Sequence, residues 1–224
     1  MEKPIIAIDG HSSTGKSSIS KAIAQKLGLI HLDTGALYRG ITLFGLKNYA
    51  DENRQINVKA LIQNLNRIAL VFKEENGDLV LYMNNENINE PIRAIEVSEN
   101  VSLIAKQPEV REFLLETQRK MAQNGGIIMD GRDIGTVVLP NADYKFFVTA
   151  SAEERARRRF LELTHSGIIT DEESVKKNLI ARDKTDSERS IAPLKQAEDA
   201  ILIDNTNLNK QESIDLILSY ILPK

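Results

Sequence analysis

The segment Gly10–Ser17 carries residue types that bind phosphate. It reads GHSSTGKS and fits the pattern G-x-x-x-x-G-K-S/T at every fixed position. In such a loop the glycines let successive backbone N–H groups point at phosphate oxygens, the lysine reaches the β- and γ-phosphates, and the last hydroxyl ligates Mg²⁺. The residues predicted to hold the phosphates of ATP are Gly10, His11, Ser12, Ser13, Thr14, Gly15, Lys16, Ser17 and Ser18. Lys16 is also a predicted catalytic residue, and Ser17 a predicted Mg²⁺ ligand.

The segments around this loop supply the context that a phosphate site needs. The apolar run Pro4–Ile8 predicts a strand before the loop, and apolar residues at helical spacing after Lys16 predict a helix that Gly28 ends. A helix that starts at the loop adds the positive end of its dipole to the same anion. The sequence therefore predicts a P-loop, which identifies a phosphoryl donor but not an acceptor.

The rest of the chain alternates short apolar runs with helical patterns, which is typical of an α/β fold with a parallel sheet. We predict the three-layer fold of P-loop NTPases with a five-stranded parallel sheet. The further predicted strands are Leu29–Asp33, Gly126–Asp130, Tyr144–Thr149 and Ala200–Asp204. The further predicted helices are Ala36–Tyr49, Pro108–Gln123, Ala152–Leu163, Glu172–Ala181 and Gln211–Ile221.

One region interrupts this alternation. Arg67–Lys73, Leu79–Met83 and Glu86–Asn89 read as successive strands, with Asn76-Gly77-Asp78 as a hairpin turn. We therefore predict a small antiparallel β insertion at roughly residues 65–95. The chain is expected to be a single domain, with a core formed by residues 1–38, 123–152 and 190–224. Residues 39–122 would form a monophosphate-binding part that includes the insertion, and residues 153–189 a helical lid with the helix that follows it.

Composition limits the classes of function. The chain has 224 residues, a formal net charge of -3 and no cysteine, so disulfides and cysteine nucleophiles are excluded. The acidic balance argues against a protein that coats nucleic acid. No apolar run approaches the ~20 residues that span a bilayer, and the N-terminus lacks a signal-peptide cleavage site. We expect a cytoplasmic protein that binds neither nucleic acid nor membrane.

Arginine and aspartate recur together in three further segments, although an isolated Arg/Asp pair is more often a structural ion pair. Two of the segments, LDTGALYR (residues 32–39) and DGRDIGTVV (130–138), follow predicted strands, and RDKTDSER (182–189) lies near a later helix end. Segments that leave the carboxyl ends of parallel strands meet in one crevice. Arginine with aspartate can bind a phosphate monoester and still hydrogen-bond a sugar or base.

Through these motifs the sequence closely resembles the bacterial cytidylate kinases, which phosphorylate CMP and dCMP. The matching segments are IAIDG-x4-GKS, LDTGALYR, DGRDIGTVV, SAEERARRR and RD-x-x-DS-x-R-x-x-APL, in family order and spacing over nearly the whole chain. The pair DGRD-I-G-T-V and RD-x-x-DS-x-R is specific to that family among P-loop kinases. The resemblance implies phosphoryl transfer from ATP to CMP or dCMP with Mg²⁺. It also implies a monomer whose partners are these small nucleotides.

The resemblance also implies residue roles. Arg39 and Arg132 correspond to arginines that hold the acceptor phosphate, and Thr34 to a hydroxyl residue facing the nucleotide. Ser102, Arg111 and Asp133 correspond to contacts on the cytosine and sugar side. Arg182, Asp186 and Arg189 correspond to a group that reads the ribose and bridges towards the phosphates. Arg155, Arg158 and Arg159 fall on the helix that resembles the family's lid, where Arg155 and Arg159 would hold ATP phosphates. Arg132, Arg158 and Arg189 are, with Lys16, the predicted catalytic residues.

Other polar residues near these motifs receive more limited predictions. Phosphoryl transfer to a phosphate oxygen needs positioning and charge neutralisation rather than a general base, so His11, His31 and His165 are not assigned catalytic roles. Asp130 is predicted to hold Mg²⁺ through water. Asp9 would either orient backbone or contact the metal.

Three functions remain open from the sequence. The first is a CMP/dCMP kinase, and the second is a kinase of the same architecture acting on UMP, AMP, shikimate or another small hydroxyl compound. The third is a nucleotide-binding module without catalysis. The DGRD and RD-x-x-DS-x-R pair and the β insertion favour the first function. The intact Lys16, Ser17 and arginine set argue against the third.

Overall fold

The structure is a computed structural model that describes residues 3–75 and 78–222. The chain divides into two compact units. Unit 1 consists of the residues up to His31 and from Gly125 onwards, and unit 2 is Leu32–Asn124. Among the described residues, no helix is both long and apolar enough to span a membrane.

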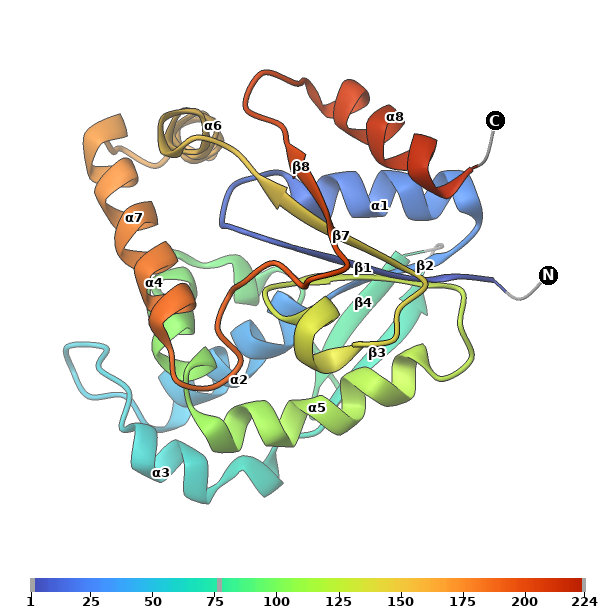
Figure 1. The fold of residues 1–224 in the computed structure, drawn as a ribbon. Coiled ribbons are helices and arrows are strands. Elements are labelled where there is room, and N and C mark those ends of the chain that lie inside the picture. Colours follow the sequence, from blue (N-terminus) through green and yellow to red (C-terminus); the bar gives the residue numbers. More distant parts are fainter. Residues whose placement is uncertain (1–2, 76–77, 223–224) are drawn as a thin grey trace. The chain divides into compact units, whose positions relative to one another are not determined.

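The main sheet has five strands in the order β2-β6-β1-β7-β8, and it confirms the predicted α/β fold class (Figure 1). β1 pairs in parallel with both β6 and β7, and β7 pairs in parallel with β8. The strands are β1 (Ile5–Gly10), β2 (Ile30–Asp33), β6 (Ile127–Gly131), β7 (Tyr144–Thr149) and β8 (Ile201–Asp204). With β1 between β6 and β7, the segments that follow these three strands leave from one edge of the sheet.

Helices α1 (Lys16–Leu27) and α8 (Lys210–Ile221) pack against the sheet with their apolar faces (Figure 1). Their isoleucines form one buried cluster with side chains of β1, β6, β7 and β8. Gly28 ends α1 in the left-handed conformation, as predicted, with φ 62°. Asn209 begins α8 in a capping box, since its side chain accepts from the backbone N–H of Glu212 while Glu212 accepts from that of Asn209.

Two further helices of unit 1, α6 (Ala152–His165) and α7 (Glu172–Glu188), pack on each other through a small cluster that includes Ala156, Val175 and Leu179. Side chains of Ser151 and Asp171 cap their first turns. Helix α7 continues past the predicted end at Ala181, so the segment RDKTDSER lies within the helix up to Glu188. A π-helical turn, η3 (Ile134–Val138), follows β6.

Unit 2 packs helices and a small antiparallel sheet around its own core. The sheet has the order β3-β4-β5, which confirms the predicted β insertion. The predicted turn at Asn76-Gly77 lies outside the described residues. The strands are β3 (Leu70–Glu75), β4 (Asp78–Met83) and β5 (Glu86–Asn87). The helices are α2 (Thr34–Asn48), α3 (Val58–Gln63), α4 (Ile95–Ala105) and α5 (Pro108–Ala122), with the short 3₁₀ turns η1 (Leu65–Arg67) and η2 (Pro91–Arg93).

Gly10, where β1 ends, has no room for a side chain. Its φ is +154°, and a Cβ there would lie 2.0 Å from the carbonyl oxygen of Val148 on β7. We expect Gly10→Ala to lower the free energy of unfolding by about 3 kcal/mol or more, because strand β7 must move to accept the methyl group. Gly28→Ala is the matched control, since it has a φ of +62° but nothing within 4 Å, and should cost only about 1 kcal/mol. Equal losses in urea denaturation of the two variants would contradict the argument.

Candidate active site

The loop after β1 has the backbone conformation of a phosphate-binding loop. Gly10, Ser13 and Gly15 all have positive φ, at 154°, 61° and 81°. Lys16 begins α1 and is buried, and its Nζ donates to the carbonyl oxygen of His11 at 3.0 Å. Thr14 Oγ1 donates to the same oxygen at 3.1 Å. The loop is therefore closed on itself, with its ammonium group at the N-terminus of a helix, where an anion is favoured.

Two further side chains in and next to this loop, His11 and Ser18, contact other residues of unit 1. The ring of His11 meets that of Phe147 edge to face, with 5.7 Å between centroids. Burial lowers the pKa of His11, and the positive charges of Arg155, Arg132 and Lys16 act in the same direction, against the opposite effect of Asp183. Ser18 Oγ donates to the carbonyl oxygen of Gly15 at 2.9 Å.

Asp130 lies at the end of β6, beside the loop. It is almost fully buried, and its Oδ2 accepts a hydrogen bond of 2.6 Å from Ser17 Oγ. Its Oδ1 lies 2.6 Å from His31 Nε2. No sequence pattern indicated a role for His31 or a contact between His31 and Asp130. The two predicted metal-binding side chains, Ser17 and Asp130, are therefore hydrogen-bonded to each other.

Asp9 orients backbone, which is one of the two predicted alternatives. Its two carboxylate oxygens accept from the backbone N–H groups of Ile134 and Gly135, at 2.8 and 2.7 Å. These N–H groups open the turn η3, where no earlier turn supplies an acceptor, so Asp9 acts as its cap. Burial raises the pKa of Asp9 to about 7, although the two backbone hydrogen bonds oppose the shift.

This raised pKa predicts a pH dependence of stability. The folded state retains the Asp9 proton up to about pH 7, whereas the unfolded chain loses it near the ordinary aspartate pKa of 3.8. The contribution of Asp9 is therefore fully present below pH 3.8 and is lost as the pH rises to about 7, at a limiting slope of about 1.4 kcal/mol per pH unit. We expect urea denaturation between pH 4 and 8 to show this slope as a difference between the wild type and Asp9→Asn. Parallel curves for the two proteins would contradict it.

The segments DGRD and RDKTDSER meet within unit 1. Arg132 Nε donates to Asp186 Oδ2 at 2.9 Å, and Arg189 Nη2 donates to Asp133 Oδ1 at 3.3 Å. Arg189 Nε also donates to the carbonyl oxygen of Ala192. Burial favours a raised pKa for Asp186, but the charges of Arg132, Arg182 and Arg189 outweigh it and lower the pKa. Three arginines therefore surround one buried carboxylate, in an arrangement suited to an anionic ligand.

The predicted lid arginines on α6 have different surroundings. Arg155 is buried, and its Nη1 donates to Asp183 Oδ2 at 2.6 Å and to the carbonyl oxygen of Ser12 at 3.3 Å. Arg159 lies less buried and forms an ion pair with Glu162 one turn on, at 2.8 Å. Arg155 therefore connects α6, α7 and the phosphate-binding loop, whereas the described contact of Arg159 stays on its own helix.

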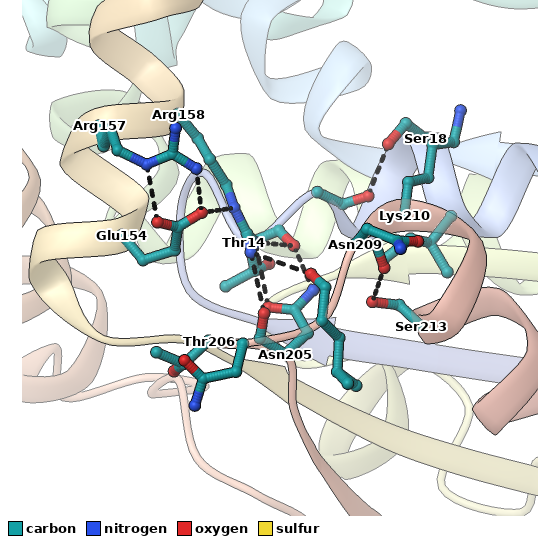
Figure 2. Close-up of a pocket in the computed structure, with 14 residues that line it drawn as sticks. Thr14, Ser18, Glu154, Arg157, Arg158, Asn205, Thr206, Asn209, Lys210 and Ser213 are labelled. Atoms are coloured by element: carbon teal, nitrogen blue, oxygen red, sulfur yellow. Dashed lines mark hydrogen bonds and ion pairs between the residues drawn. The ribbon is translucent and has the colours of Figure 1, made fainter.

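A pocket of about 460 Å³ lies beside the loop and is lined by α6, the start of α1 and residues 205–210 (Figure 2). Arg158 is one of the lining residues: Nη1 donates to Asn205 Oδ1 at 3.1 Å, and Nη2 to the Asn205 carbonyl oxygen at 2.8 Å. Asn205 Nδ2 in turn donates to the carbonyl oxygen of Thr14 at 2.9 Å. Hydrogen bonds from Arg157 and Arg158 lower the pKa of Glu154 to about 2, against the effect of burial. Arg158 thus holds the loop after β8 against the phosphate-binding loop.

The remaining predicted acceptor residues lie in unit 2. Thr34 is buried and begins α2. Arg39, one and a half turns later, pairs with Asp33. The guanidinium of Arg111 on α5 lies 5.4 Å from the centre of the Tyr38 ring and donates to the carbonyl oxygen of Ala105 at 3.1 Å. Ser102 is half-buried on α4, which packs on α2.

Three residues take part in this site without having been given a role from the sequence. Asp183 pairs with Arg155, Glu154 with Arg157 and Arg158, and His31 with Asp130. Asp183 and Asp186 are three positions apart on a helix, and this spacing is the one signal that could have indicated a shared arginine-binding face. Glu154 lies four positions before Arg158, and this spacing on a helix likewise could have indicated their ion pair.

Comparisons with known proteins give one consistent family. The family described as cytidylate kinase matches residues 6–222. A cytidylate kinase of Streptococcus pneumoniae (strain 70585) is 49% identical over 213 residues, covering 95% of this chain and 94% of that protein. The cytidylate kinase of S. pneumoniae strain Hungary19A-6 has the same identity and coverage.

Solved structures show the fold at much lower identity. A shikimate kinase from Bacteroides thetaiotaomicron has a TM-score of 0.50 at 12% identity, covering 97% of this chain and 98% of that one. An uncharacterised protein from Eubacterium ventriosum has a TM-score of 0.51 at 14% identity, with 98% of both chains covered. These likenesses support the α/β fold that the strand order already showed.

Proposed function

Because this chain belongs to the cytidylate kinase family, whose members phosphorylate CMP, we propose that it transfers the γ-phosphoryl group of ATP to CMP and to dCMP. The observation that carries the proposal is the pair of anion-binding arrangements in unit 1. One is the loop Gly10–Ser17 with Lys16, and the other is the group of arginines around Asp186. Phosphoryl transfer needs one anion-binding site for the donor phosphates and a second for the acceptor phosphate.

The chemistry asks for charge neutralisation rather than a general base. The acceptor phosphate oxygen is already a nucleophile, so the chain has to bring two anions together and stabilise the charge that spreads over the moving phosphoryl group. Lys16 would do this from the donor side, and Arg132 and Arg189 from the acceptor side. Arg182 and Asp186 would hold the ribose, and Thr34, Arg39, Ser102, Arg111 and Asp133 the rest of the acceptor nucleotide.

The donor base is proposed to bind in the pocket beside the phosphate-binding loop (Figure 2). The pocket is lined by Thr14 and Gly15 of the predicted phosphate-binding loop and by residues 205–209. Its volume of about 460 Å³ lies within the range of small-molecule sites. Backbone groups of residues 205–209 would read the base edge, and Arg157 also lines the pocket.

Mg²⁺ fits the oxygen donors that are present. The Ser17 hydroxyl can offer its oxygen to a metal while it donates its hydrogen to Asp130, and a carboxylate suits Mg²⁺ directly or through water. Within residues 3–75 and 78–222, no group of three or more His, Cys, Asp or Glu side chains could hold a metal by itself. This agrees with a metal that takes the rest of its ligands from substrate phosphates and water. When bound, Mg²⁺ would neutralise part of the phosphate charge.

We propose that α6 and α7 form the lid that keeps water out of the site. An open kinase site would pass the phosphoryl group to water, so a mobile element has to cover it. Arg155 and Asp183 already tie these helices to Ser12 of the phosphate-binding loop. We propose that this connection is formed in the closed state, and that Arg155 and Arg159 then face the ATP phosphates.

Arg158→Ala tests the assignment of the donor pocket. Loss of the guanidinium removes the hydrogen bonds that hold Asn205 and the carbonyl oxygen of Leu208, so the loop after β8 loses its anchor on α6. We expect the KM for ATP to rise about tenfold and turnover to fall, with the KM for CMP changed by less than about twofold. Lys177→Ala removes one exposed positive charge from α7 and should change none of these constants. An unchanged KM for ATP would contradict the role of Arg158.

A coupled assay of ADP release tests the proposed function. It is run with ATP and Mg²⁺ against CMP, dCMP, UMP, AMP and shikimate as acceptors. We expect the highest kcat/KM with CMP and dCMP. A preference for UMP or AMP would refute the proposed acceptor, and no turnover with any of the five would refute the enzyme proposal.

A further inference from the structure

The carboxylate of Asp130 is held at both oxygens. Oδ2 accepts from Ser17 Oγ and Oδ1 contacts His31 Nε2, each at 2.6 Å. The Asp130 side chain is only 1% exposed, whereas that of His31 is 17% exposed. A buried carboxylate without such partners is strongly disfavoured, because few water molecules can solvate it. The two contacts therefore contribute to the orientation of the carboxylate plane.

His31 is brought to Asp130 by strand pairing rather than by a flexible loop. It lies on β2, which neighbours β6 in the sheet, and the backbone N–H of the preceding Ile30 donates to the carbonyl oxygen of Gly126 at 2.8 Å. A carboxylate oxygen accepts hydrogen bonds, and the N–H of an imidazole at Nε2 is the donor that suits this contact. The imidazole therefore donates from a fixed backbone position, and a chain of hydrogen bonds runs from His31 through Asp130 to Ser17.

We propose that His31 is a positioning residue for the divalent metal of the donor nucleotide, acting through the carboxylate of Asp130. The proposal rests on the proposed function, in which Ser17 and Asp130 hold Mg²⁺. His31 would keep the Asp130 carboxylate turned so that Oδ2 receives the Ser17 hydrogen, and an oxygen lone pair of Ser17 would then be available to the metal. Carboxylates that hold metals depend on such outer hydrogen bonds, and loss of one costs about 10–100-fold in metal affinity.

The experiment compares His31→Leu, which removes the donor, with His31→Gln, which keeps an N–H donor at similar reach. Mn²⁺ serves as the metal probe, and its free concentration is followed by electron paramagnetic resonance in the presence of protein and ADP. We expect His31→Leu to weaken Mn²⁺ binding to the protein–ADP complex by about 10–100-fold, and His31→Gln to restore it to within about threefold of the wild type. ADP binding in excess EDTA, measured by calorimetry, should be the same in all three proteins.

A kinetic arm gives a second readout. The Mg²⁺ concentration for half-maximal turnover should rise in His31→Leu, while the KM for CMP stays unchanged. His165→Leu is the control for loss of a histidine, since His165 lies exposed at the end of α6 and contacts the carbonyl oxygen of Leu161. It should behave as the wild type in both arms.

Two outcomes would overturn the proposal. One is wild-type Mn²⁺ affinity in His31→Leu, and the other is an equal loss in the Leu and Gln variants together with weaker metal-free ADP binding, which would indicate a purely structural role. Should His31→Leu fail to fold, His31→Asn carries the same comparison, because its shorter amide leaves Asp130 out of reach. The Mn²⁺ titration does not depend on the acceptor, so a wild type that fails to phosphorylate CMP refutes the proposed function alone.

Discussion

Lys16→Met is expected to lower kcat about 10³-fold while the protein stays folded. Lys16 is buried at the start of α1, and its Nζ lies inside the loop, 3.0 Å from the carbonyl oxygen of His11. In that position the ammonium group can follow the β- and γ-phosphates as negative charge moves between them. A methionine side chain fills the same space without the charge, so charge stabilisation in the transition state is lost. Steady-state kinetics with saturating ATP and CMP would measure the change.

Binding and stability serve as the controls for this variant. CMP affinity, measured by calorimetry without ATP, should remain within about twofold of the wild type, because the assigned acceptor residues do not include Lys16. The free energy of unfolding should change by no more than about 1 kcal/mol. Lys16→Arg should not restore turnover, since a planar guanidinium is not equivalent to a compact ammonium group. A kcat within tenfold of the wild type in Lys16→Met would contradict the assignment.

Local patterns in the sequence were sufficient for the framework of unit 1. The strand before the loop, the loop and the helix after it occupy consecutive residues. The spacing of their apolar residues and the positions of their glycines are therefore enough to predict them from the local sequence. Strand β7 was predicted with its observed bounds, because Tyr144–Thr149 is apolar and ends at polar residues. The antiparallel sheet of unit 2 was also predicted from local patterns, because its strands follow one another directly in the sequence.

Local patterns failed where tertiary contacts decide the structure. The end of α7, from Arg182 to Glu188, has no apolar period, and its carboxylates find partners 28 and 54 positions away in Arg155 and Arg132. Helix α3 has six residues, and it was missed because so short a segment barely develops a period. Helix α4 was also missed, since its isoleucines and valines suit strands as well as helices.

Most residues of the candidate site were predictable from the sequence, but several of the contacts between them were not. Motif spacing gave Lys16, Ser17 and Asp130, and the resemblance to a family gave the arginines. Neither the motifs nor the resemblance indicates that Arg158 hydrogen-bonds with Asn205, 47 positions away. They also do not indicate that His31 contacts Asp130, 99 positions away. Both contacts depend on which strands are neighbours in the sheet, and the order of strands in the sheet differs from their order in the chain.

Arg132→Met is expected to impair both stability and acceptor binding. Arg132 donates to Asp186 at 2.9 Å, and the two side chains are 17% and 6% exposed. Removing the arginine leaves a buried carboxylate with less compensating charge, for which the expected loss in free energy of unfolding is about 3–5 kcal/mol. The predicted contact of Arg132 with the acceptor phosphate is lost as well, so kcat/KM for CMP should fall about 10²-fold or more. Urea denaturation and CMP kinetics would measure the two effects.

A double-mutant cycle separates the ion pair from the loss of the arginine itself. In Asp186→Asn the carboxylate charge is gone but its shape is kept, so the buried charge that makes Arg132→Met costly no longer exists. The double variant should therefore be more stable than the sum of the two single losses implies, by a coupling energy of about 0.5–3 kcal/mol. It should not regain activity with CMP, because the arginine assigned to the acceptor phosphate is still missing. Strict additivity in stability would show that Arg182 and Arg189, whose charges also lower the pKa of Asp186, compensate its carboxylate without Arg132.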